Sequence, residues 1–308
     1  MVLAKGSCVV ALVLAASVPA LAQTPPNAPV PATVGTAQQI DFTSAINGKT
    51  YRITVAKPYA FPPKGGYPVV YVLDGGAYFG TFAGAARLRS ALGAELAPAI
   101  IVGISYPSES MLVAQERRML DLTHSSPEAS RPALGVAGKP VETGGADAFY
   151  RVIETEVRPR VAAVAQVAQG QDVLFGHSLG GLFVLHTMFQ HPEAFRTYLA
   201  LSPSIWWTGR SVLKDEAAFA AKVKAGQTAP RVFIGVGGEE QPPTVPSSAE
   251  YRMVDNTIEL AARLSALKGG PGYKVESKVF AGQSHMSVPW EALNTMLNFA
   301  LGKGSQQP

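Results

Sequence analysis

A serine between closely spaced glycines is the first residue in this sequence that could do chemistry. Residues 176–180 are Gly-His-Ser-Leu-Gly, with Ser178 at the centre. A strand-like run over residues 172–175 leads into this motif, and an apolar helix-like run over residues 179–189 leaves it. Glycines two positions before and after the serine let a strand and a helix approach closely at a sharp turn. The pattern predicts that Ser178 is a strained, exposed nucleophile that attacks ester carbonyl groups.

A serine hydroxyl is a poor nucleophile at neutral pH and needs a general base, and the sequence contains five histidines. His285 lies in a short loop between a strand-like run over residues 275–280 and the last helix-like run. In hydrolases with a strand–turn–helix nucleophile, the chain order is serine, acid, histidine, and the histidine follows the last strand. We therefore predict that His285 is the base. The other histidines are not expected to fill this role: His124, His177, His186 and His191.

The carboxylate that orients the base should follow the penultimate strand, which the sequence places at residues 231–236. The run Gly-Gly-Glu-Glu comes next and ends at Glu240. A carboxylate here would orient His285 and stabilise its imidazolium. Glu240 fits a Gly-x-x-acid spacing and is the predicted acid. The alternatives are Glu239, Asp255 and a serine–histidine dyad without a working acid.

Two backbone N–H groups should stabilise the negative charge that develops on the carbonyl oxygen, and each such donor contributes roughly a hundredfold or more in rate. One donor should be Leu179, the residue after the nucleophile. The other should lie in the loop after an early strand, where residues 72–76 are Val-Leu-Asp-Gly-Gly. Gly76 is the predicted donor and Gly75 the neighbouring alternative, while Asp74 is expected to brace the loop.

Strand-like and helix-like runs alternate along the chain and would position these residues. Strands are expected at residues 51–56, 69–73, 99–104, 173–175, 198–201, 232–236 and 275–280. Helices are expected at residues 146–168, 179–189, 217–224, 249–267 and 290–301. Short continuous apolar runs are typical of strands buried on both faces of a parallel sheet. The alternation predicts one α/β domain with a mostly parallel central sheet and helices on both faces, and the strand–turn–helix setting of Ser178 within it is typical of the α/β-hydrolase fold.

The predicted hydrolase domain spans residues 39–303, and residues 304–308 are expected to be a disordered tail. Residues 23–38 contain much proline, alanine and threonine, which indicates a disordered leader. Within the domain, the largely polar segment over residues 108–145 is expected to be a long excursion over the sheet edge and a candidate lid.

The segment before this leader, residues 1–22, has the pattern of a secretion signal. Lys5 precedes an apolar run over residues 9–21, and the triplet Ala-Leu-Ala that ends at Ala22 fits a small-x-small cleavage site. The apolar run is too short for a comfortable membrane span, so no stable membrane insertion is expected after cleavage. Cys8, the only cysteine, lies in this segment, and the mature chain would have no disulfide. These features predict a periplasmic or secreted protein.

The net charge of the chain argues against one class of partner, nucleic acids. The formal net charge is +4 and no dense lysine or arginine run is present, so there is no nucleic-acid-binding signature. A serine mechanism needs no metal ion or organic cofactor, and none is expected. The expected partner is a small-molecule ester substrate.

Three longer runs occur together: Tyr-Val-Leu-Asp-Gly at residues 71–75, Gly-His-Ser-Leu-Gly-Gly at 176–181 and Leu-Ser-Pro-Ser-Ile-Trp-Trp at 201–207. In combination they resemble the esterase branch of the α/β-hydrolases that contains the enterobactin, salmochelin and bacillibactin siderophore esterases. Further matching runs lie at residues 121–123, 144–149 and 285–289. The resemblance extends from about residue 40 to about residue 300.

This resemblance implies a Ser–acid–His hydrolase that acts on esters, with ferric siderophore trilactones as the best-known substrates of the branch. It assigns the nucleophile to Ser178 and the base to His285, and it points to Glu240 through the Gly-Gly-Glu-Glu run. The branch often has proline after Asp-Leu-Thr, where this chain has His124.

Aromatic and basic side chains near the expected site are candidates for substrate binding. Trp206 and Trp207 follow the strand after the nucleophile helix, at the carboxyl edge of the sheet where ligands bind. Aromatic walls suit aryl or catechol groups, and packing in the core is the alternative for each tryptophan. Arg118, beside Arg117, could bind a carboxylate or catecholate, or could lie on a solvated charged face.

Together these assignments predict a serine carboxylic-ester hydrolase that works through an acyl-enzyme, with siderophore trilactone esters as candidate substrates. One alternative is an acyltransferase of the same fold, in which an alcohol outcompetes water. Another is a non-catalytic ligand-binding protein built on this scaffold, which would be expected to have a disabled triad.

Overall fold

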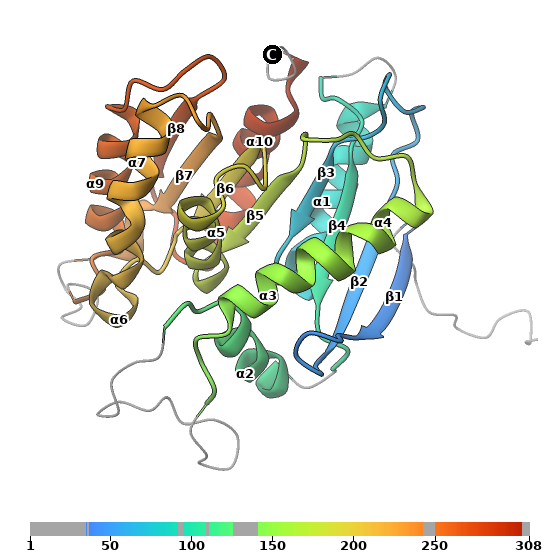
Figure 1. Ribbon diagram of the computed structural model, residues 1–308, viewed down its shortest axis with the longest axis horizontal. Coiled ribbons are helices and arrows are strands. Elements are labelled where there is room, and N and C mark those ends of the chain that lie inside the picture. Colours follow the sequence, from blue (N-terminus) through green and yellow to red (C-terminus); the bar gives the residue numbers. More distant parts are fainter. Residues whose placement is uncertain are drawn as a thin grey trace, which may run out of the picture. The chain divides into compact units, whose positions relative to one another are not determined.

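A mixed sheet lies at the centre of the computed structural model, which describes residues 35, 37–91, 95–108, 111–125, 141–242 and 250–303. Across the sheet, the strands of this described part are β1 (Gln38–Thr43), β2 (Thr50–Ala56), β4 (Ile100–Ser105), β3 (Val69–Val72), β5 (Val173–His177), β6 (Thr197–Leu201), β7 (Arg231–Gly237) and β8 (Lys274–Phe280) (Figure 1). From β4 to β8 all neighbours are parallel, while β2 is antiparallel to β4 and β1 is antiparallel to β2. The mostly parallel sheet confirms the predicted α/β-hydrolase fold.

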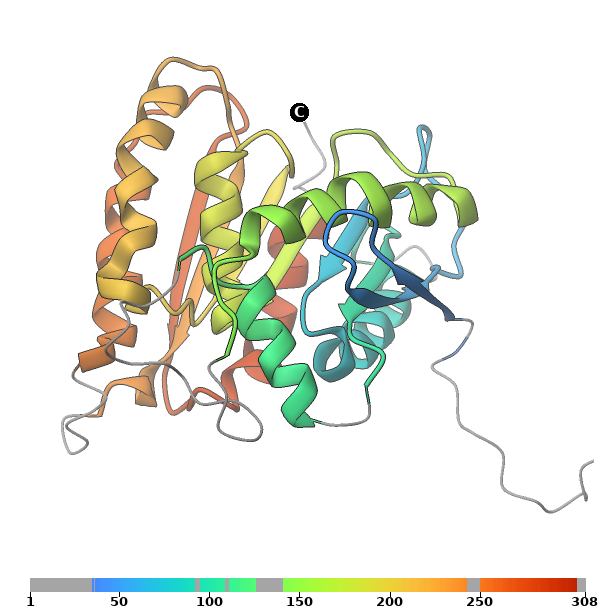
Figure 2. The same cartoon turned by 60° about the horizontal axis from the view of Figure 1, so that its bottom comes forward.

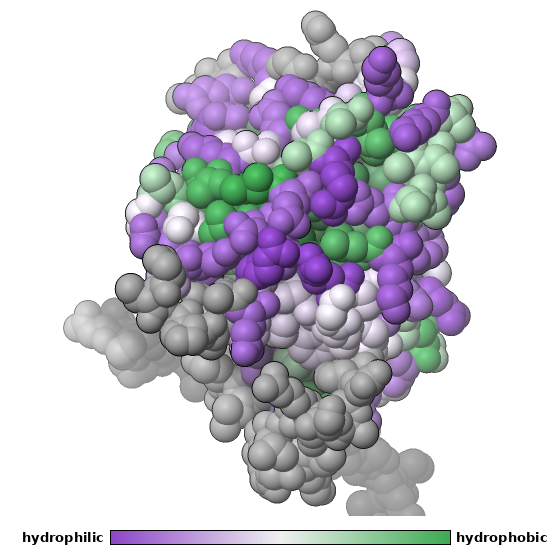
Figure 3. Space-filling model, turned by 90° about the vertical axis from the view of Figure 1, so that its left-hand side faces the viewer, coloured by the Kyte–Doolittle hydropathy of each residue, from purple (hydrophilic) through white to green (hydrophobic). Residues whose placement is uncertain are grey.

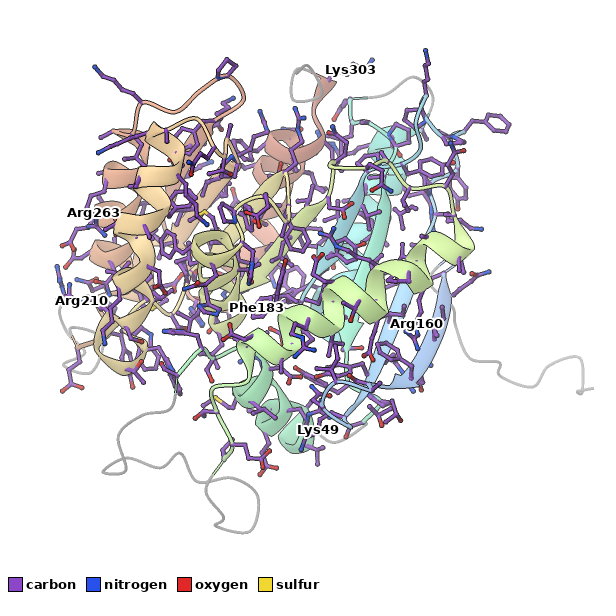
Figure 4. All side chains as sticks on the ribbon, viewed as in Figure 1. Lys49, Arg160, Phe183, Arg210, Arg263 and Lys303 are labelled. Atoms are coloured by element: carbon purple, nitrogen blue, oxygen red, sulfur yellow. The ribbon has the colours of Figure 1, made fainter. Side chains whose placement is uncertain are left out.

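Helices cover both faces of this sheet. The bounds on one face are α1 (Gly75–Ser90) and α10 (Val288–Leu301). On the other face they are α3 (Ala146–Val152), α4 (Arg158–Val164), α5 (Leu179–Gln190), α7 (Glu216–Lys224) and α9 (Met253–Ser265). Each face has its own apolar core. Phe82 of α1 packs on Phe175 of β5 with ring centroids 4.6 Å apart. Opposite, Phe183 of α5, labelled in Figure 4, packs on Phe149 of α3 at 5.2 Å.

The central strands are buried along nearly their whole length, which confirms the expectation drawn from their continuous apolar runs. Every residue of β3, β5, β6 and β7 is buried. The edge strand β8 is mostly exposed. The other edge strand, β1, buries only Phe42 among its six residues, and it therefore has no apolar run that sequence patterning could detect.

The predicted helix over residues 146–168 is present as far as Val164 but is not one regular α-helix, and Val167 forms a parallel β-bridge with Tyr67 instead. A π-helical turn over Ile153–Val157 separates α3 from α4, and Pro159 lies in the first turn of α4. Proline has no N–H to donate and its ring crowds the preceding turn, so a change of helical register at this point is expected. The apolar positions that predicted the helix, including Val152 and Val161, are buried.

The two glycines after β3, expected to lie in a loop, form the first turn of α1 instead. A Cβ at Gly75 would lie 2.7 Å from the carbonyl carbon of Gly103 in β4, whereas a Cβ at Gly76 would meet no atom within 4 Å. Glycine at position 75 therefore lets α1 start directly against the sheet. Gly76 is exposed at the same helix start.

The predicted excursion over residues 108–145 contains α2 (Met111–Asp121), which packs against α3 (Figure 2). The segment 126–140, the predicted signal over residues 1–22 and the predicted tail over residues 304–308 lie outside the described residues. β1 starts at Gln38, the last residue of the predicted leader. None of the helices in the described part has the length and apolar character that crossing a membrane requires.

Candidate active site

The backbone at Ser178 has a conformation that the surrounding structure must hold in place. Ser178 lies between β5 and α5 with φ 60° and ψ −119°, outside the regions that most residues prefer. Its N–H donates to the carbonyl of Leu201 at 3.0 Å. Its own carbonyl accepts from the N–H groups of Leu182 at 3.0 Å and Ser204 at 3.1 Å. The serine is half-buried at the start of α5, in the strand–turn–helix geometry that a nucleophile elbow requires.

Two glycines of this elbow stand where no side chain fits. A Cβ at Gly176 would overlap the backbone of Gly180 in α5. A Cβ at Gly181 would lie 2.8 Å from the carbonyl oxygen of Leu201, at the end of β6. Any other residue would push the helix away from both strands. The glycines therefore allow the close approach that holds the strained serine.

Glu240 and His285 form a hydrogen-bonded pair, with Oε2 and Nδ1 2.6 Å apart. The carboxylate is buried, and its other oxygen accepts from the N–H of Gly237 at 2.7 Å and the hydroxyl of Ser202 at 2.5 Å. Because a carboxylate only accepts hydrogen bonds, Nδ1 of the histidine carries the proton and Nε2 is left as an acceptor. The side chain of His285 is 38% exposed, so substrate and water can reach it.

A short turn decides which of two neighbouring glutamates reaches the histidine. The 3₁₀ turn η4 (Gly238–Glu240) follows β7 and directs Glu240 inward. Glu239 is exposed, and its N–H donates to the carbonyl of Gln283 at 3.0 Å. Asp255, on α9, accepts from the side-chain amide of Gln241 at 2.7 Å. Of the three candidate carboxylates, the structure brings Glu240 against His285.

His177 is buried next to the elbow and contacts the candidate base. Its ring centroid lies 4.5 Å from that of His285, and the hydroxyl of Tyr78 on α1 lies 2.9 Å from its Nδ1. Burial, with smaller contributions from the nearby His285 and Arg118, lowers the pKa of His177 to about 3. Since His177 precedes Ser178 in the chain, the ring contact brings His285 next to the elbow.

The two predicted oxyanion donors lie in the first turns of two helices. Leu179 is the first residue of α5, and Gly76 is the second residue of α1. The first N–H groups of a helix have no partner within the helix and carry partial positive charge. The two helix starts are neighbours, because a Cβ at Gly180 would lie 3.5 Å from Oδ2 of Asp74. Both helices start just after parallel strands, β3 and β5. Their first N–H groups therefore lie at the carboxyl edge of the sheet, where Ser178 also lies.

Asp74 and Arg118 form a two-bond ion pair beside the start of α1. The Nε and Nη2 atoms of Arg118, on α2, each lie 3.0 Å from one carboxylate oxygen of Asp74. Asp74 has a left-handed backbone, with φ 52° and ψ 45°. The ion pair holds this turn in place, in keeping with the bracing role expected for Asp74. Arg118, predicted to bind substrate, is thus already paired within the chain.

The two tryptophans differ in their surroundings. Trp207 is buried, and its Nε1–H donates to the carbonyl of Ser125 at 3.0 Å. Trp206 is half-buried, and its ring centroid lies 4.4 Å from that of Tyr251. Tyr251 is 42% exposed, and no sequence pattern singled it out. Trp206 and Tyr251 form an accessible aromatic pair, whereas Trp207 ties the segment after β6 to the excursion.

The remaining histidines have partners away from this site. Nε2 of His186 lies 2.7 Å from Oδ1 of Asp147. The ring of His124 stacks on the ring of His186, with centroids 5.1 Å apart. His191 stacks on Tyr150 at 4.0 Å. Within the described ranges, no group of three or more histidine, cysteine, aspartate or glutamate side chains could hold a metal ion.

Comparison with known proteins gives a matching family model, similar relatives and a similar solved structure. The family model described as "Putative esterase" matches residues 44–293. The ferri-bacillibactin esterase BesA of Bacillus subtilis is 34% identical over 262 residues, which cover 84% of this chain and 88% of the relative. The siderophore triacetylfusarinine C esterase of Aspergillus fumigatus is 36% identical over 266 residues, 78% of this chain and 85% of the relative. The crystal structure of the BES protein from Bacillus cereus has a TM-score of 0.78 and 35% identity, and the match covers 89% of this chain and 98% of that one.

The buried, neutral His177 should make the fold less stable in acid. Its pKa is about 3 in the folded chain, and an unfolded histidine has a pKa of about 6.5. Between these values the unfolded chain binds more protons, so this group contributes stability that is lost as the pH falls below about 6.5. In His177→Asn, whose side-chain amide can hydrogen-bond to Tyr78 as donor or acceptor, we expect the loss of unfolding free energy between about pH 7 and pH 4.5 to be smaller by about 2 kcal/mol.

Urea unfolding of the wild type and of His177→Asn at the two pH values measures this difference. Other groups also titrate in this range, including Asp121, whose pKa is raised to about 6 by burial. Because they are present in both proteins, their contributions cancel in the difference between wild type and variant. Equal losses of unfolding free energy in both proteins would show that His177 is not held neutral by the fold.

Proposed function

The chain belongs to the family described as Putative esterase, and from this premise we propose that it is a serine carboxylic-ester hydrolase that works through an acyl-enzyme. The observation that carries the proposal is the buried, hydrogen-bonded Glu240 paired with His285, beside the strained backbone of Ser178. In this proposal Ser178 is the nucleophile, His285 is the general base and Glu240 is the acid that orients the base.

Acylation begins when Nε2 of His285 accepts the proton of Ser178 and the serine Oγ bonds to the ester carbonyl carbon. Glu240 stabilises the imidazolium, and its hydrogen bonds to Ser202 and Gly237 keep it oriented. N–H groups at the starts of α5 and α1, from Leu179 and Gly76, stabilise the oxyanion. The bond to the alcohol then breaks, and His285 gives its proton to the departing alkoxide.

Deacylation repeats the sequence with water as the nucleophile. His285 takes a proton from water, the water oxygen bonds to the acyl carbon, and the bond to Ser178 breaks as the serine recovers its proton. The 38% exposure of the histidine side chain leaves it open to bulk water, the nucleophile that this step requires.

The proposed substrates are ester-linked siderophores, with trilactones as the main candidates. Two relatives are named a ferri-bacillibactin esterase and a siderophore triacetylfusarinine C esterase. The accessible ring pair of Trp206 and Tyr251 suits a ligand with aryl groups. Without residues 1–22, which contain Lys5, the chain keeps a formal net charge of +3, which favours the approach of an anionic ferric complex.

We further propose that the protein is exported to the periplasm or secreted, because residues 1–22 have the pattern of a cleaved signal. Intact mass measurement of protein recovered from the periplasm of a Gram-negative host is expected to match a chain that starts at Gln23. Recovery from the cytoplasm of a chain that still carries Lys5 and Cys8 would contradict this proposal.

Replacing the nucleophile tests the reaction and the substrate class together. Ser178→Ala should lower turnover by a factor of about 10⁴ or more, because the acyl-enzyme can no longer form. Initial rates are measured for both proteins with p-nitrophenyl butyrate and with ferric and iron-free trilactone siderophores. Turnover by Ser178→Ala at the wild-type rate would remove Ser178 from the mechanism. Wild-type turnover of the butyrate ester without turnover of either trilactone would leave the esterase standing and refute the substrate class.

The neighbouring glutamates form a matched pair of variants for the acid. Glu240→Gln should lower kcat by roughly a thousandfold, because an amide cannot stabilise the imidazolium and can reverse the histidine tautomer. Glu239→Gln makes the same chemical change on an exposed side chain, and its kcat should equal that of the wild type. The kcat of each variant on p-nitrophenyl butyrate decides the assignment. Similar small losses in both would favour a dyad without an acid.

A further inference from the structure

β8 forms one edge of the sheet in the described part of the chain, and one side of its backbone faces away from β7. It is last in the strand order, and within the described part of the chain its strand partner is β7. The N–H of Lys274 donates to the carbonyl of Pro230, immediately before β7, at 3.4 Å. Backbone groups alternate in direction along a strand, so Glu276 and Lys278 also bond toward β7. The N–H and C=O groups that point outward belong to Val275, Ser277 and Val279.

The sequence of β8 is complementary to itself when two copies run antiparallel. Lys274–Phe280 is Lys-Val-Glu-Ser-Lys-Val-Phe, with Ser277 at its centre. When Ser277 faces Ser277 of a second copy, Val275 faces Val279 and Glu276 faces Lys278, each of them twice. The outward groups of Ser277 form a hydrogen-bonded pair, so the Glu276–Lys278 pairs are non-hydrogen-bonded, with Cα atoms about 4.5 Å apart. Opposite charges stabilise such pairs.

The two neighbouring registers, centred on Lys278 and on Glu276, place like charges directly opposite each other. A pairing centred on Lys278 brings two lysines face to face, and one centred on Glu276 brings two glutamates together and sets Lys274 against Lys278. Like charges directly opposite each other destabilise a strand pair, and lysines on an edge strand ordinarily prevent sheets from joining. Of these three registers, the one centred on Ser277 sets opposite charges face to face, and the charges of β8 favour it over its two neighbours.

Helix α9 adds apolar surface beside this strand. Ile258 of α9 is 49% exposed and Val279 of β8 is 40% exposed, and both line a hollow of about 330 Å³ between the helix and the strand. Ala262 and Ser265, small residues of the same helix, line it too. Figure 3 looks onto this side of the molecule, where hydrophobic patches lie between hydrophilic side chains. A second copy joined at β8 brings its own α9 alongside, and the small residues let the two helices approach.

We propose that the protein forms a two-fold symmetric dimer in which β8 pairs with β8 of a second copy, in the register centred on Ser277. The two sheets become one continuous sheet, and the two α9 helices pack against each other on one of its faces. Each contact occurs twice because the interface is isologous. Two Glu276–Lys278 pairs set the register, and the burial of Ile258 and Val279 contributes apolar contact area.

A single cysteine at the centre of the interface tests this register. The full chain carries Cys8 as its only cysteine, so Cys8→Ser provides a cysteine-free background. In that background Ser277→Cys should form a covalent dimer on mild oxidation, because the Cα atoms of a hydrogen-bonded antiparallel pair are about 5.5 Å apart, within disulfide range. Thr43→Cys, exposed on the opposite edge strand β1, is the control and should stay monomeric on non-reducing gels.

Charge reversal tests the ion pairs in the unmodified chain. Lys278→Glu should raise the dimer dissociation constant about tenfold, because two attractive pairs become repulsive. Glu276→Lys combined with Lys278→Glu restores both pairs and should return the constant toward the wild-type value. Lys64→Glu makes the same charge change at an exposed position elsewhere and should have no effect. Sedimentation velocity measures the constants, and turnover of p-nitrophenyl butyrate verifies that each variant is folded.

Three results would overturn the proposal. One is a wild-type chain that sediments as a monomer at its highest soluble concentration in low salt. The second is equal crosslinking of Ser277→Cys and Thr43→Cys. The third is a double charge reversal that stays as weak as Lys278→Glu alone, since that would show that Glu276 does not face Lys278.

Discussion

The proposed chemistry depends on how closely β5, α5 and the end of β6 approach one another around Ser178. A residue with φ 60° and ψ −119° costs on the order of 1–3 kcal/mol and persists only where its surroundings over-determine it. Here the surroundings are hydrogen bonds to Leu201, Leu182 and Ser204, together with glycines that permit the contact. The strain turns the serine side chain out of the β5 alternation and holds it at the start of a helix.

The segment after β6 joins this elbow to the acid. Ser202 has φ 42° and is completely buried, its N–H donates to the carbonyl of Gly235 at 2.7 Å, and its hydroxyl donates to Glu240. Two residues later, the N–H of Ser204 donates to the carbonyl of Ser178. One short run therefore contacts both the proposed nucleophile and the proposed acid, so any shift of the run would move both. The positions of Ser178 and Glu240 are coupled through this segment after β6.

Features that follow from local pattern could be predicted, and those that depend on distant contacts could not. Continuous apolar runs predicted the central strands, and the spacing of Gly176 and Gly180 predicted the elbow geometry. The helix α1 (Gly75–Ser90) was not predicted at all, and its start at Gly75 depends on close approach to Gly103 in a different strand. Sequence spacing favoured Glu240 over Glu239, but the contact that distinguishes them arises from a three-residue turn whose direction is set by tertiary packing. The catalytic roles themselves remain predictions.

Other missed features have the same cause. The ring of Tyr251 meets Trp206 across the fold, and Arg118 meets Asp74 between two helices, so neither pairing leaves a trace in local sequence. β1 pairs along its whole length with β2 but buries a single phenylalanine, so its stability comes from backbone pairing that composition does not report. In each case a distant partner decides the structure, and the pattern of neighbouring residues carries no information about that partner.

The protonation state of His177 matters for the proposed reaction, because its ring lies 4.5 Å from that of His285. During acylation His285 becomes an imidazolium. Two unit positive charges at about that separation repel by about 4 kcal/mol at the effective dielectric of a protein surface, enough to cancel much of the stabilisation that Glu240 provides. Burial lowers the pKa of His177 to about 3 and keeps it neutral. The hydroxyl of Tyr78 lies 2.9 Å from its Nδ1, and the fold thus uses a neutral imidazole as a packing surface for the base and leaves Glu240 as the charged group that His285 meets.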